Sequence, residues 1–264
     1  MQDLTVTLIQ SGIIWKDIPA NLSNYSQLIG DIKIDTDLIV LPEMFNTGFI
    51  VEPSGVSETM DGMTVEWMKE TTRIKNCVIT GSLIINDDGR FFNRLIWMRP
   101  DGSFETYDKR HLFSFAKEDL KFHKGMKKLI VDLKGWRIHP LICYDLRFPV
   151  WSKNTLSEKG YAYDLLIYIA NWPSQRSLAW RCMLPARAVE NLSYVIGVNR
   201  IGMDDYGNSY AGDSMIIAPD GEKLLAIEAE KKGIATFKLS ATDLLDFRSH
   251  FAFSQDWDHF KINP

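Results

Sequence analysis

The sequence predicts an α/β fold, a four-layer α-β-β-α sandwich, and three observations lead to this prediction. Segments with the apolar content of strands outnumber segments with the spacing of amphipathic helices. The strands form two groups along the chain, the first ending near residue 108 and the second beginning near residue 128. Each group includes amphipathic helices that can cover one face of a sheet. Two sheets packed face to face, with helices outside, account for all three observations.

The first group begins with the buried strand LTVTLIQ at residues 4–10. A helix follows, in which apolar residues recur at helical spacing: Leu22, Tyr25, Leu28, Ile29 and Ile32. A second helix is expected near residues 64–75. The remaining strands of this group are expected at residues 38–42, 77–85, 91–98 and 104–108, with turns at Asp87-Asp88-Gly89 and Pro100-Asp101-Gly102.

The second group follows a long irregular loop of mixed charge at residues 108–127. It opens with a hairpin, KLIVDL and WRIHPLIC joined by a turn at Lys134-Gly135, whose second strand delivers Cys143. A later helix is expected to kink at Pro185. Its apolar face is expected to consist of Leu178, Cys182, Pro185, Val189 and Leu192. The other strands are expected at residues 165–171, 193–199, 213–219, 222–228 and 233–239, with a short helix near 240–248.

No Pro-, Gly- or Ser-rich linker divides the chain, and no short repeat or low-complexity segment is present. Residues 1–264 are therefore expected to form a single domain with a large core, since 45% of them are hydrophobic. The formal charge of −4 and the lack of a basic run argue against nucleic acid or an anionic membrane as a partner. The start, MQDLTVTLIQ, does not resemble a signal peptide, and the uncharged stretches are too short to span a bilayer.

Cys77, Cys143 and Cys182 are an odd number of cysteines at wide spacings. This pattern is typical neither of a disulfide framework nor of a CxxC metal site, so a reducing cytoplasm is the expected location. The five histidines show no HExxH or other ligand spacing. We therefore expect no metal and no other cofactor.

Three polar residues interrupt apolar runs at the ends of predicted strands. Glu43 follows DLIVLP, Lys109 follows FETYD, and Cys143 follows PLI. Taken singly, each has a structural explanation: a helix cap or ion pair for Glu43, a solvated charge for Lys109 and a small buried hydrophobe for Cys143. Together they have the composition that thiol-based amide hydrolysis requires. A thiol with a pKa of about 8.5 is mostly protonated at neutral pH, so a carboxylate must accept its proton and a cation must stabilise the charge that forms.

The segments LPEMFNTGF, YDKRHLF and LICYDLRFP, in that order, resemble the three signature segments of the nitrilase superfamily, carbon–nitrogen hydrolases with a Glu-Lys-Cys triad. The resemblance covers nearly the whole chain and implies the same four-layer sandwich. It implies that Glu43 is the general base, Lys109 the cation that stabilises the oxyanion, and Cys143 the nucleophile. Members also have a second glutamate after the lysine that orients it. Glu118 is the best match here, and the neighbouring Asp119 is the alternative.

The reaction that this resemblance implies has two halves. Glu43 takes the proton of Cys143 as the thiol attacks an amide carbonyl, and Lys109 with the backbone N–H of Tyr144 stabilises the oxyanion. Glu43 then protonates the departing ammonia, which leaves a thioester. Water activated by Glu43 hydrolyses the thioester and restores the thiol.

Within the superfamily, FNTGF, ANWP at residues 170–173 and the stretch NLSYVIGVNRIGMDDYGNSYAGDS are similar to the omega-amidase branch. This similarity implies a small-molecule amide substrate, the terminal amide of a 2-oxo acid such as 2-oxoglutaramate or 2-oxosuccinamate. A guanidinium can clamp a carboxylate bidentately. The expected substrate-binding residues are Phe45, Phe115, Tyr144 and Trp172, with Arg147 as the carboxylate clamp.

These substrate-binding assignments have structural alternatives. The aromatic side chains could be plain core residues, and Arg147 could pair with Asp145 or lie in an interface. If Arg147 is structural, Arg176 or Arg181 after the ANWP segment could be the clamp. Residues 206 and 210, both tyrosines, lie in a turn-rich stretch where lining of the pocket and exposure to solvent are equally open.

Two other functions remain open. One is a related hydrolase that acts on an N-carbamoyl amino acid, an aliphatic amide or a nitrile. The other is a non-catalytic scaffold or redox-sensing thiol protein, against which the complete set of Glu43, Lys109 and Cys143 argues. Superfamily members commonly pair through a helix and strand that flank the nucleophile region. The resemblance therefore implies a homodimer or a higher homo-oligomer.

Overall fold

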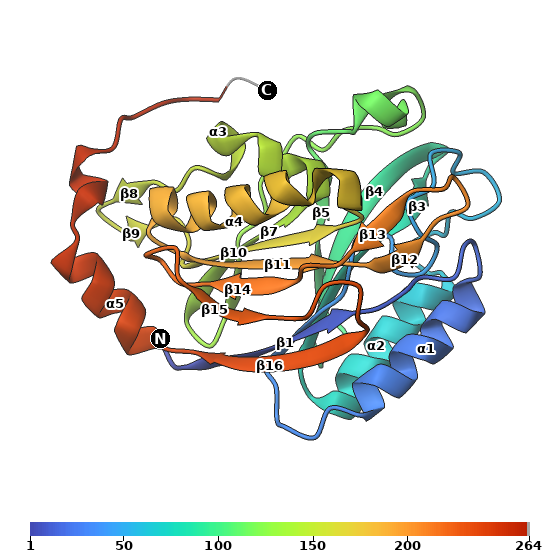
Figure 1. Ribbon diagram of the computed structural model, residues 1–264, viewed down its shortest axis with the longest axis horizontal. Coiled ribbons are helices and arrows are strands. Elements are labelled where there is room, and N and C mark those ends of the chain that lie inside the picture. The colour runs from blue at the N-terminus through green and yellow to red at the C-terminus, as the bar shows by residue number, and fades with distance from the viewer. Residues whose placement is uncertain (263–264) are drawn as a thin grey trace.

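Two six-stranded sheets pack face to face in the computed structural model, which describes residues 1–262. Helices α1 (Ile18–Gly30) and α2 (Met63–Lys75) cover the outer face of the first sheet, and α4 (Ser177–Asn191) covers the outer face of the second (Figure 1). The predicted four-layer α-β-β-α sandwich is therefore confirmed.

The first sheet has the strand order β16-β1-β2-β3-β4-β5. Its strands are β16 (Gly233–Leu239), β1 (Leu4–Gln10), β2 (Leu38–Val40), β3 (Val78–Asp87), β4 (Arg90–Met98) and β5 (Phe104–Asp108). β1, β2 and β3 are parallel, whereas β16, β4 and β5 pair antiparallel with their neighbours. Side chains alternate between the two faces, so Leu8 and Val40 enter the main core while Ile9 and Ile39 pack with α1 and α2.

The second sheet has the strand order β15-β14-β11-β10-β7-β6. Its strands are β15 (Lys223–Ala226), β14 (Met215–Ile217), β11 (Tyr194–Asn199), β10 (Leu165–Ala170), β7 (Trp136–Ile142) and β6 (Val131–Leu133). β7, β10 and β11 are parallel to one another. All six residues of β10 are buried, as expected for a parallel strand that is covered on both faces.

Short elements decorate the two sheets. They are α3 (Pro149–Ser152), α5 (Ala241–His250), the paired strands β8 (Leu156–Ser157) and β9 (Gly160–Tyr161), the paired strands β12 (Ile201–Met203) and β13 (Ser209–Ala211), and the 3-10 turns η1 (Ser114–Ala116), η2 (Glu118–Leu120), η3 (Cys143–Arg147), η4 (Ser174–Arg176) and η5 (Phe253–Asp256). η1 and η2 lie within the loop expected at residues 108–127. Neither of the two small hairpins was expected, because their strands are only two or three residues long and carry little hydrophobic pattern.

The apolar face predicted for α4 is wrong for most of its residues, although Leu192, just after the helix, is buried as expected. Leu178 is 76% exposed and Val189 is 50% exposed. The face that packs on the second sheet instead carries Trp180, Leu184 and Ala188. Both sets of residues recur every three or four positions, so spacing alone permits either face. Burial of the large Trp180 ring removes more apolar surface from water and decides between them.

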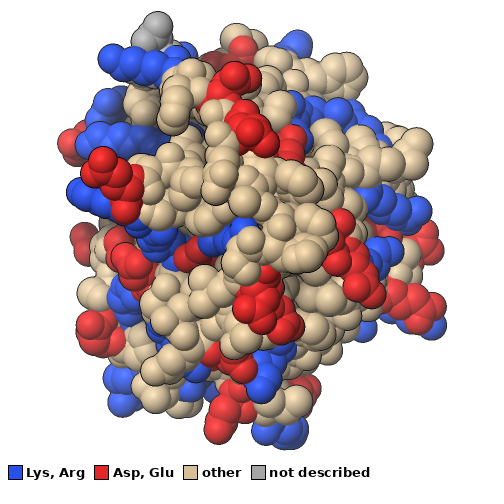
Figure 2. All heavy atoms as spheres, turned by 90° about the vertical axis from the view of Figure 1, so that its left-hand side faces the viewer, with Lys and Arg blue, Asp and Glu red and all other residues tan. Residues whose placement is uncertain are grey.

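Charges of both signs are mixed on the surface. Lysine and arginine side chains lie interspersed with aspartate and glutamate over the face shown in Figure 2. Among residues 1–262, no helix has both the length and the apolar character needed to cross a bilayer.

Gly197 on β11 lies directly under α4 and leaves no room for a side chain. A Cβ at this position would lie 2.4 Å from Leu184 Cδ1 and 2.7 Å from Trp180 Cζ2. We therefore expect Gly197→Ala to lower the free energy of unfolding by about 1–3 kcal/mol through overpacking. The measurement is urea denaturation, in which the midpoint should fall while the m-value stays constant.

Gly30→Ala, at the end of α1, is the matched control, since no atom lies within 4 Å of the added Cβ. Alanine is the better helix former, so this variant should be neutral or slightly stabilised. Equal midpoints for Gly197→Ala and the unmodified protein would contradict the close packing of α4 on β11.

Candidate active site

Three strand ends from the two sheets meet at one edge of the sandwich. Glu43 lies three residues after β2, Lys109 directly follows β5, and Cys143 directly follows β7. The structure brings these predicted residues together: Lys109 Nζ lies 2.9 Å from Glu43 Oε1, and Lys109 and Cys143 line the same pocket. Residues separated by a hundred positions in the chain therefore form one cluster.

Lys109 is buried between two carboxylates. Its Nζ donates to Glu43 Oε1 at 2.9 Å and to Glu118 Oε2 at 2.9 Å. All three side chains are at most 1% exposed. Glu118 Oε2 also accepts from the backbone N–H of Phe113 at 2.6 Å, whereas Asp119 points to solvent. The structure thus places Glu118, and not its neighbour, against the lysine.

The charged groups of this cluster shift one another's pKa values, because the cluster is buried away from water. Burial lowers the pKa of Lys109, but the Glu118 and Glu43 carboxylates outweigh burial and hold this pKa above its usual value. Burial raises the pKa of Glu118 despite the neighbouring ammonium. The pKa of Cys143 is raised well above its usual value, first by burial and then by the Glu43 carboxylate. Within residues 1–262 no cluster of three or more His, Cys, Asp or Glu side chains is arranged to hold a metal ion.

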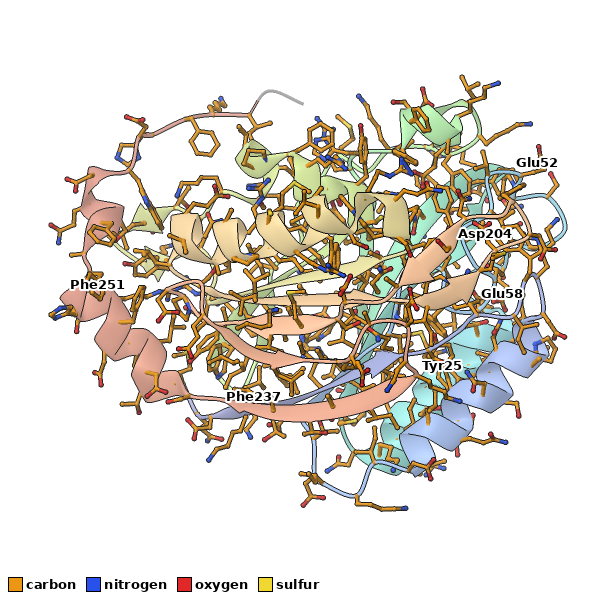
Figure 3. The ribbon with its side chains drawn as sticks, viewed as in Figure 1. Tyr25, Glu52, Glu58, Asp204, Phe237 and Phe251 are labelled. Carbon is orange, nitrogen blue, oxygen red and sulfur yellow. The ribbon has the colours of Figure 1, made fainter. Side chains whose placement is uncertain are left out.

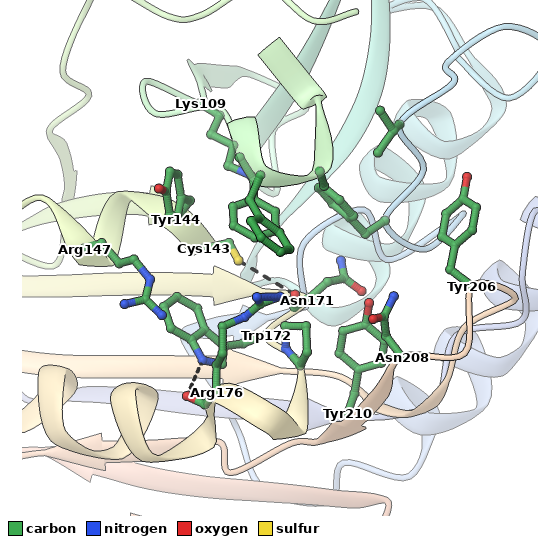
Figure 4. Close-up of a pocket in the computed structure, with 16 residues that line it drawn as sticks. Lys109, Cys143, Tyr144, Arg147, Asn171, Trp172, Arg176, Tyr206, Asn208 and Tyr210 are labelled. Atoms are coloured by element: carbon green, nitrogen blue, oxygen red, sulfur yellow. Dashed lines mark hydrogen bonds between the residues drawn. The ribbon is translucent and has the colours of Figure 1, made fainter. Parts of the chain in front are cut away.

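Two asparagines hold the Glu43 carboxylate in place. Asn93 Nδ2, from β4, donates to Glu43 Oε1 at 2.7 Å. The backbone N–H of Asn171, just after β10, donates to Glu43 Oε2 at 2.8 Å, and Asn171 Nδ2 donates to the Glu43 carbonyl at 2.6 Å. Cys143 Sγ lies 3.9 Å from the Asn171 carbonyl oxygen (Figure 4). Contacts from both sheets therefore fix the carboxylate beside the thiol.

Cys143 occupies a sharp turn between β7 and η3. Its φ of 43° is in the left-handed region, where a residue with a side chain is uncommon unless its surroundings hold it there. Asp145 provides the restraint, accepting from the Ile142 N–H at 3.1 Å, from Tyr107 Oη at 2.8 Å and from the His111 N–H at 3.0 Å. The turn that carries the thiol is therefore tied to the segment that carries Lys109.

A cavity of about 450 Å³ opens above the cluster, within the usual size range of small-molecule sites. Four of the predicted substrate-binding residues line it: Phe115, Tyr144, Arg147 and Trp172. Phe115, in η1, is 81% exposed, whereas Trp172 is buried in the wall of the cavity. Figure 4 labels Tyr144, Arg147 and Trp172.

Phe45 does not line the cavity, so its assignment to substrate binding is wrong. The ring is fully buried on the far side of the first sheet, 5.4 Å from the ring of Tyr25 on α1, which Figure 3 labels, and 5.8 Å from that of Trp67 on α2. Gly81 leaves the space that the ring occupies. Phe45 lies only two residues from Glu43, but the turn after β2 directs the two side chains to opposite sides of the sheet.

Sequence reasoning missed other residues that line the cavity. They are Phe49, Val51, Phe113, Ala116, Asn171, Pro173 and Asn208. Arg176, which the sequence offered only as an alternative clamp, also lines the cavity. Asn171 follows a buried strand directly, as Lys109 and Cys143 do, so the same pattern could have identified it. The others lie on loops whose path the sequence does not specify.

The hairpin formed by β12 and β13 forms one wall of the cavity. It carries the two tyrosines for which the sequence left open whether they line the pocket or face solvent. Tyr206 and Tyr210 both line the cavity. Asp204, labelled in Figure 3, accepts from the Tyr206 N–H at 2.9 Å, from the Asn208 N–H at 2.9 Å and from Tyr210 Oη at 2.8 Å. The buried Arg200 guanidinium lies 4.6 Å from the Tyr210 ring centre. This wall is held rigidly by one carboxylate and one cation.

Arg147 faces the cavity and does not pair with Asp145. The Asp145 carboxylate is bound by His111 at 2.8 Å instead. The Arg147 guanidinium lies 4.8 Å from the ring centre of Trp172. Arg181, one of the two alternatives to Arg147 as the carboxylate clamp, pairs with Asp213 and does not line the cavity.

Comparison with known proteins agrees with this geometry. A model of the carbon-nitrogen hydrolase family matches residues 5–248. The chain is similar to the omega-amidase YafV of Escherichia coli (strain K12), with 42% identity over 262 residues that cover 99% of this chain and 100% of that protein. It is 28% identical to the 2-oxoglutaramate amidase of Bacillus subtilis (strain 168), over 92% of this chain and 93% of that protein. A solved structure from Xanthomonas campestris, described as a member of the carbon–nitrogen hydrolase superfamily with an arsenic adduct in its active site, matches with a TM-score of 0.97 and 40% identity over the whole of both chains. The chain therefore belongs to the carbon–nitrogen hydrolase family.

Proposed function

We propose that this protein is an omega-amidase, which hydrolyses the terminal amide of a small 2-oxo acid such as 2-oxoglutaramate to the dicarboxylate and ammonia. The observation that carries the proposal is the buried set of Glu43, Lys109 and Cys143 beneath a cavity with arginines in its wall. The omega-amidase and 2-oxoglutaramate amidase relatives support the choice of amide. The three free cysteines, Cys77, Cys143 and Cys182, support a reducing cytoplasm as its location.

The first step is attack by the Cys143 sulfur on the amide carbonyl. The raised pKa of Cys143 keeps the resting side chain a neutral thiol. Glu43 therefore accepts the proton as the carbon–sulfur bond forms, and the carbonyl π electrons move onto oxygen. Proton transfer from the thiol to Glu43 leaves the net charge of the cluster unchanged, which avoids a second uncompensated negative charge in a buried site.

Lys109 and the backbone N–H of Tyr144 stabilise the tetrahedral oxyanion. Lys109 is charged in the resting state, because two carboxylates raise its pKa. Its position is fixed before the substrate arrives, so little reorganisation is needed as charge develops. One such donor typically contributes about 2.7–4 kcal/mol to stabilisation of the transition state. Glu118 holds the ammonium and takes no proton from the substrate.

Collapse of the tetrahedral intermediate expels the nitrogen. Glu43 returns its proton to the leaving group, ammonia departs, and a thioester remains on Cys143. Glu43 then removes a proton from water, which attacks the thioester carbonyl. The carbon–sulfur bond breaks, the acid product leaves, and the thiolate regains its proton from Glu43.

Arg147 is the residue that we propose as the clamp for the substrate carboxylate. Its guanidinium is held over the face of Trp172, which leaves the N–H groups at the edge of the plane free for an acceptor. A carboxylate bound there would place the distal amide toward the thiol. The same cavity would give no such anchor to a neutral aliphatic amide or nitrile.

The protein is also proposed to form a homodimer through the outward face of α4. Leu178, Cys182 and Val189 lie exposed on this helix, an apolar stripe that is unusual for a solvated surface. A second copy of the chain, presenting the same stripe, is the simplest complementary partner.

The proposed activity is tested by measuring ammonia release from a panel of amides. We expect the highest kcat/KM for 2-oxoglutaramate and 2-oxosuccinamate, and lower values for glutamine, an N-carbamoyl amino acid and a nitrile. Cys143→Ala should abolish all turnover because no other group can form the thioester. The matched controls are Cys77→Ala and Cys182→Ala, which should retain activity because neither thiol lines the cavity.

Two outcomes of this panel would reject different parts of the proposal. Preference for another amide would reject the omega-amidase assignment alone. Full activity of a folded Cys143→Ala variant would reject the thiol mechanism.

Replacing the buried cation tests its role in the chemistry. Lys109→Gln removes the charge that faces the oxyanion, so kcat should fall by about 10²–10³-fold or more while KM changes less. Stopped assays at saturating substrate measure this, with circular dichroism to verify the fold. Lys69→Gln on α2, which removes a lysine paired with Glu66 far from the cavity, should behave as the unmodified protein. Near-normal kcat in a folded Lys109→Gln protein would remove the lysine from the mechanism.

The proposed dimer is tested by light scattering coupled to size-exclusion chromatography. The unmodified chain should elute with about twice the monomer mass of 30.3 kDa. Leu178→Glu should give a monomer, because a buried carboxylate in an apolar interface is costly. Ile74→Glu is the matched control, since Ile74 on α2 is 66% exposed but lies on a different helix. A monomeric unmodified protein, or a dimer that survives Leu178→Glu, would contradict the proposed interface.

A further inference from the structure

The cavity contains a second arginine, Arg176, that forms no ion pair with the described residues. Arg147 and Arg176 both line the cavity, and none of the described residues that line it is an aspartate or a glutamate. Within residues 1–262 neither arginine forms an ion pair. The Arg176 guanidinium instead lies 5.1 Å from the ring centre of Phe113 and 5.7 Å from that of Phe115. Two cations therefore face an otherwise uncharged wall.

One tryptophan organises both arginines. The face of Trp172 carries the Arg147 guanidinium, and Trp172 Nε1 donates to the Arg176 carbonyl at 2.8 Å. The Trp172 backbone is fixed in turn by Asn199, which accepts from its N–H at 2.8 Å and donates to its carbonyl at 3.0 Å. In the view of Figure 4 the two arginine side chains flank Trp172. Trp172 thus holds the guanidinium of Arg147 and fixes the backbone that carries Arg176 before a ligand binds.

The cavity is electrically polarised. At its base, Glu43 and Glu118 together exceed the charge of Lys109 and leave one net negative charge beside the thiol. The wall carries the positive charges of Arg147 and Arg176. A ligand that fits this field is neutral where it meets the thiol and negative or strongly hydrogen-bond accepting at its other end. A positive group at that other end would be repelled by both guanidinium groups.

We infer that Arg176 is a specificity-determining residue that acts with Arg147 to bind the 2-oxo acid end of the substrate. A 2-oxo carboxylate offers three oxygen acceptors close together, and two planar guanidinium groups can bind them from two directions. The corresponding amino acid amide has an α-ammonium group in place of the oxo oxygen. The same two cations then exclude it. This inference rests on the proposed omega-amidase function. It assigns the enzyme's discrimination between 2-oxo acid amides and amino acid amides to a second arginine, Arg176.

The inference is tested by measuring kcat/KM of the Arg176→Gln variant and of the unmodified protein for three substrates. For 2-oxoglutaramate, kcat/KM should fall by about 10- to 100-fold, because charge-assisted hydrogen bonds are lost. For glutamine, kcat/KM should stay the same or rise, because one source of repulsion is removed. For a small neutral amide without a carboxylate, kcat/KM should not change. Arg176→Lys keeps the charge but loses the fork, so it should partly restore 2-oxoglutaramate hydrolysis and still reject glutamine.

Arg181→Gln is the matched control. Arg181 lies five residues after Arg176, in the first part of α4. It pairs with Asp213 and does not line the cavity. This variant should leave the ratio of the kcat/KM values for 2-oxoglutaramate and glutamine unchanged. Equal losses toward all three substrates in a folded Arg176→Gln protein would show that Arg176 only supports the loop of Phe113 and Phe115, and would overturn the inference.

A binding measurement separates this inference from the proposed reaction. Calorimetry with Cys143→Ala, which cannot form the thioester, should detect 2-oxoglutaramate binding more tightly than glutamine, and adding Arg176→Gln should weaken 2-oxoglutaramate binding by about 10-fold or more. If the unmodified protein failed to hydrolyse 2-oxoglutaramate, the proposed function would fail, yet Arg176-dependent binding of 2-oxoglutaramate would still support the inference. If 2-oxoglutaramate were the best substrate and Arg176→Gln did not weaken its binding, the proposed function would stand and the inference would fall.

Discussion

A lysine buried between two carboxylates governs the electrostatics of the candidate site and links it to the packing of the two sheets. Transferring an ammonium group from water into a protein interior costs several kcal/mol unless charges of opposite sign compensate it. Glu43 and Glu118 do so at 2.9 Å each, with one negative charge to spare. That surplus charge, together with burial, is why the pKa of Cys143 is raised and why its thiol keeps its proton at rest. In the proposed mechanism, the nucleophile is therefore generated by transfer of a proton within the cluster, and not by prior ionisation.

The two packed sheets are what makes this charge cluster possible. Glu43 and Lys109 come from the first sheet, Cys143 comes from the second, and Asn171 from the second sheet donates to the Glu43 carboxylate. A shift of one sheet against the other would leave buried charges without partners, which is strongly destabilising. Asp145 adds a further connection, because it restrains the turn of the nucleophile and binds the segment after β5. The catalytic geometry and the packing of the sandwich are thus consequences of each other.

Substrate recognition depends on different parts of the chain. The cavity is bounded by the loop that contains η1 and η2, by η4 and by the hairpin of β12 and β13, all of which lie outside the two sheets. A scaffold of this kind can hold the same reactive cluster under different walls, so the fold defines the chemistry more closely than the substrate. Here the wall supplies positive charge and aromatic faces, and the base supplies negative charge. In the proposed reaction, this field favours an amide whose other end is an anion.

The amino-acid sequence alone predicts the fold class, the order along the chain of the strands in the two sheets, and the candidate reactive residues. Strands were recognisable because runs such as LLIYIA are buried on both faces, and Glu43, Lys109 and Cys143 stood out as polar residues at the ends of such runs. The three-dimensional packing was needed to show which face of α4 is buried, that Phe45 belongs to the core, and that Arg176 lies in the cavity. These features depend on neighbours that are remote in sequence, and local periodicity carries no information about such neighbours. Strand ends converge because strands pair side by side in a regular way within each sheet. Loops and helix faces instead take the orientation that the packing around them allows.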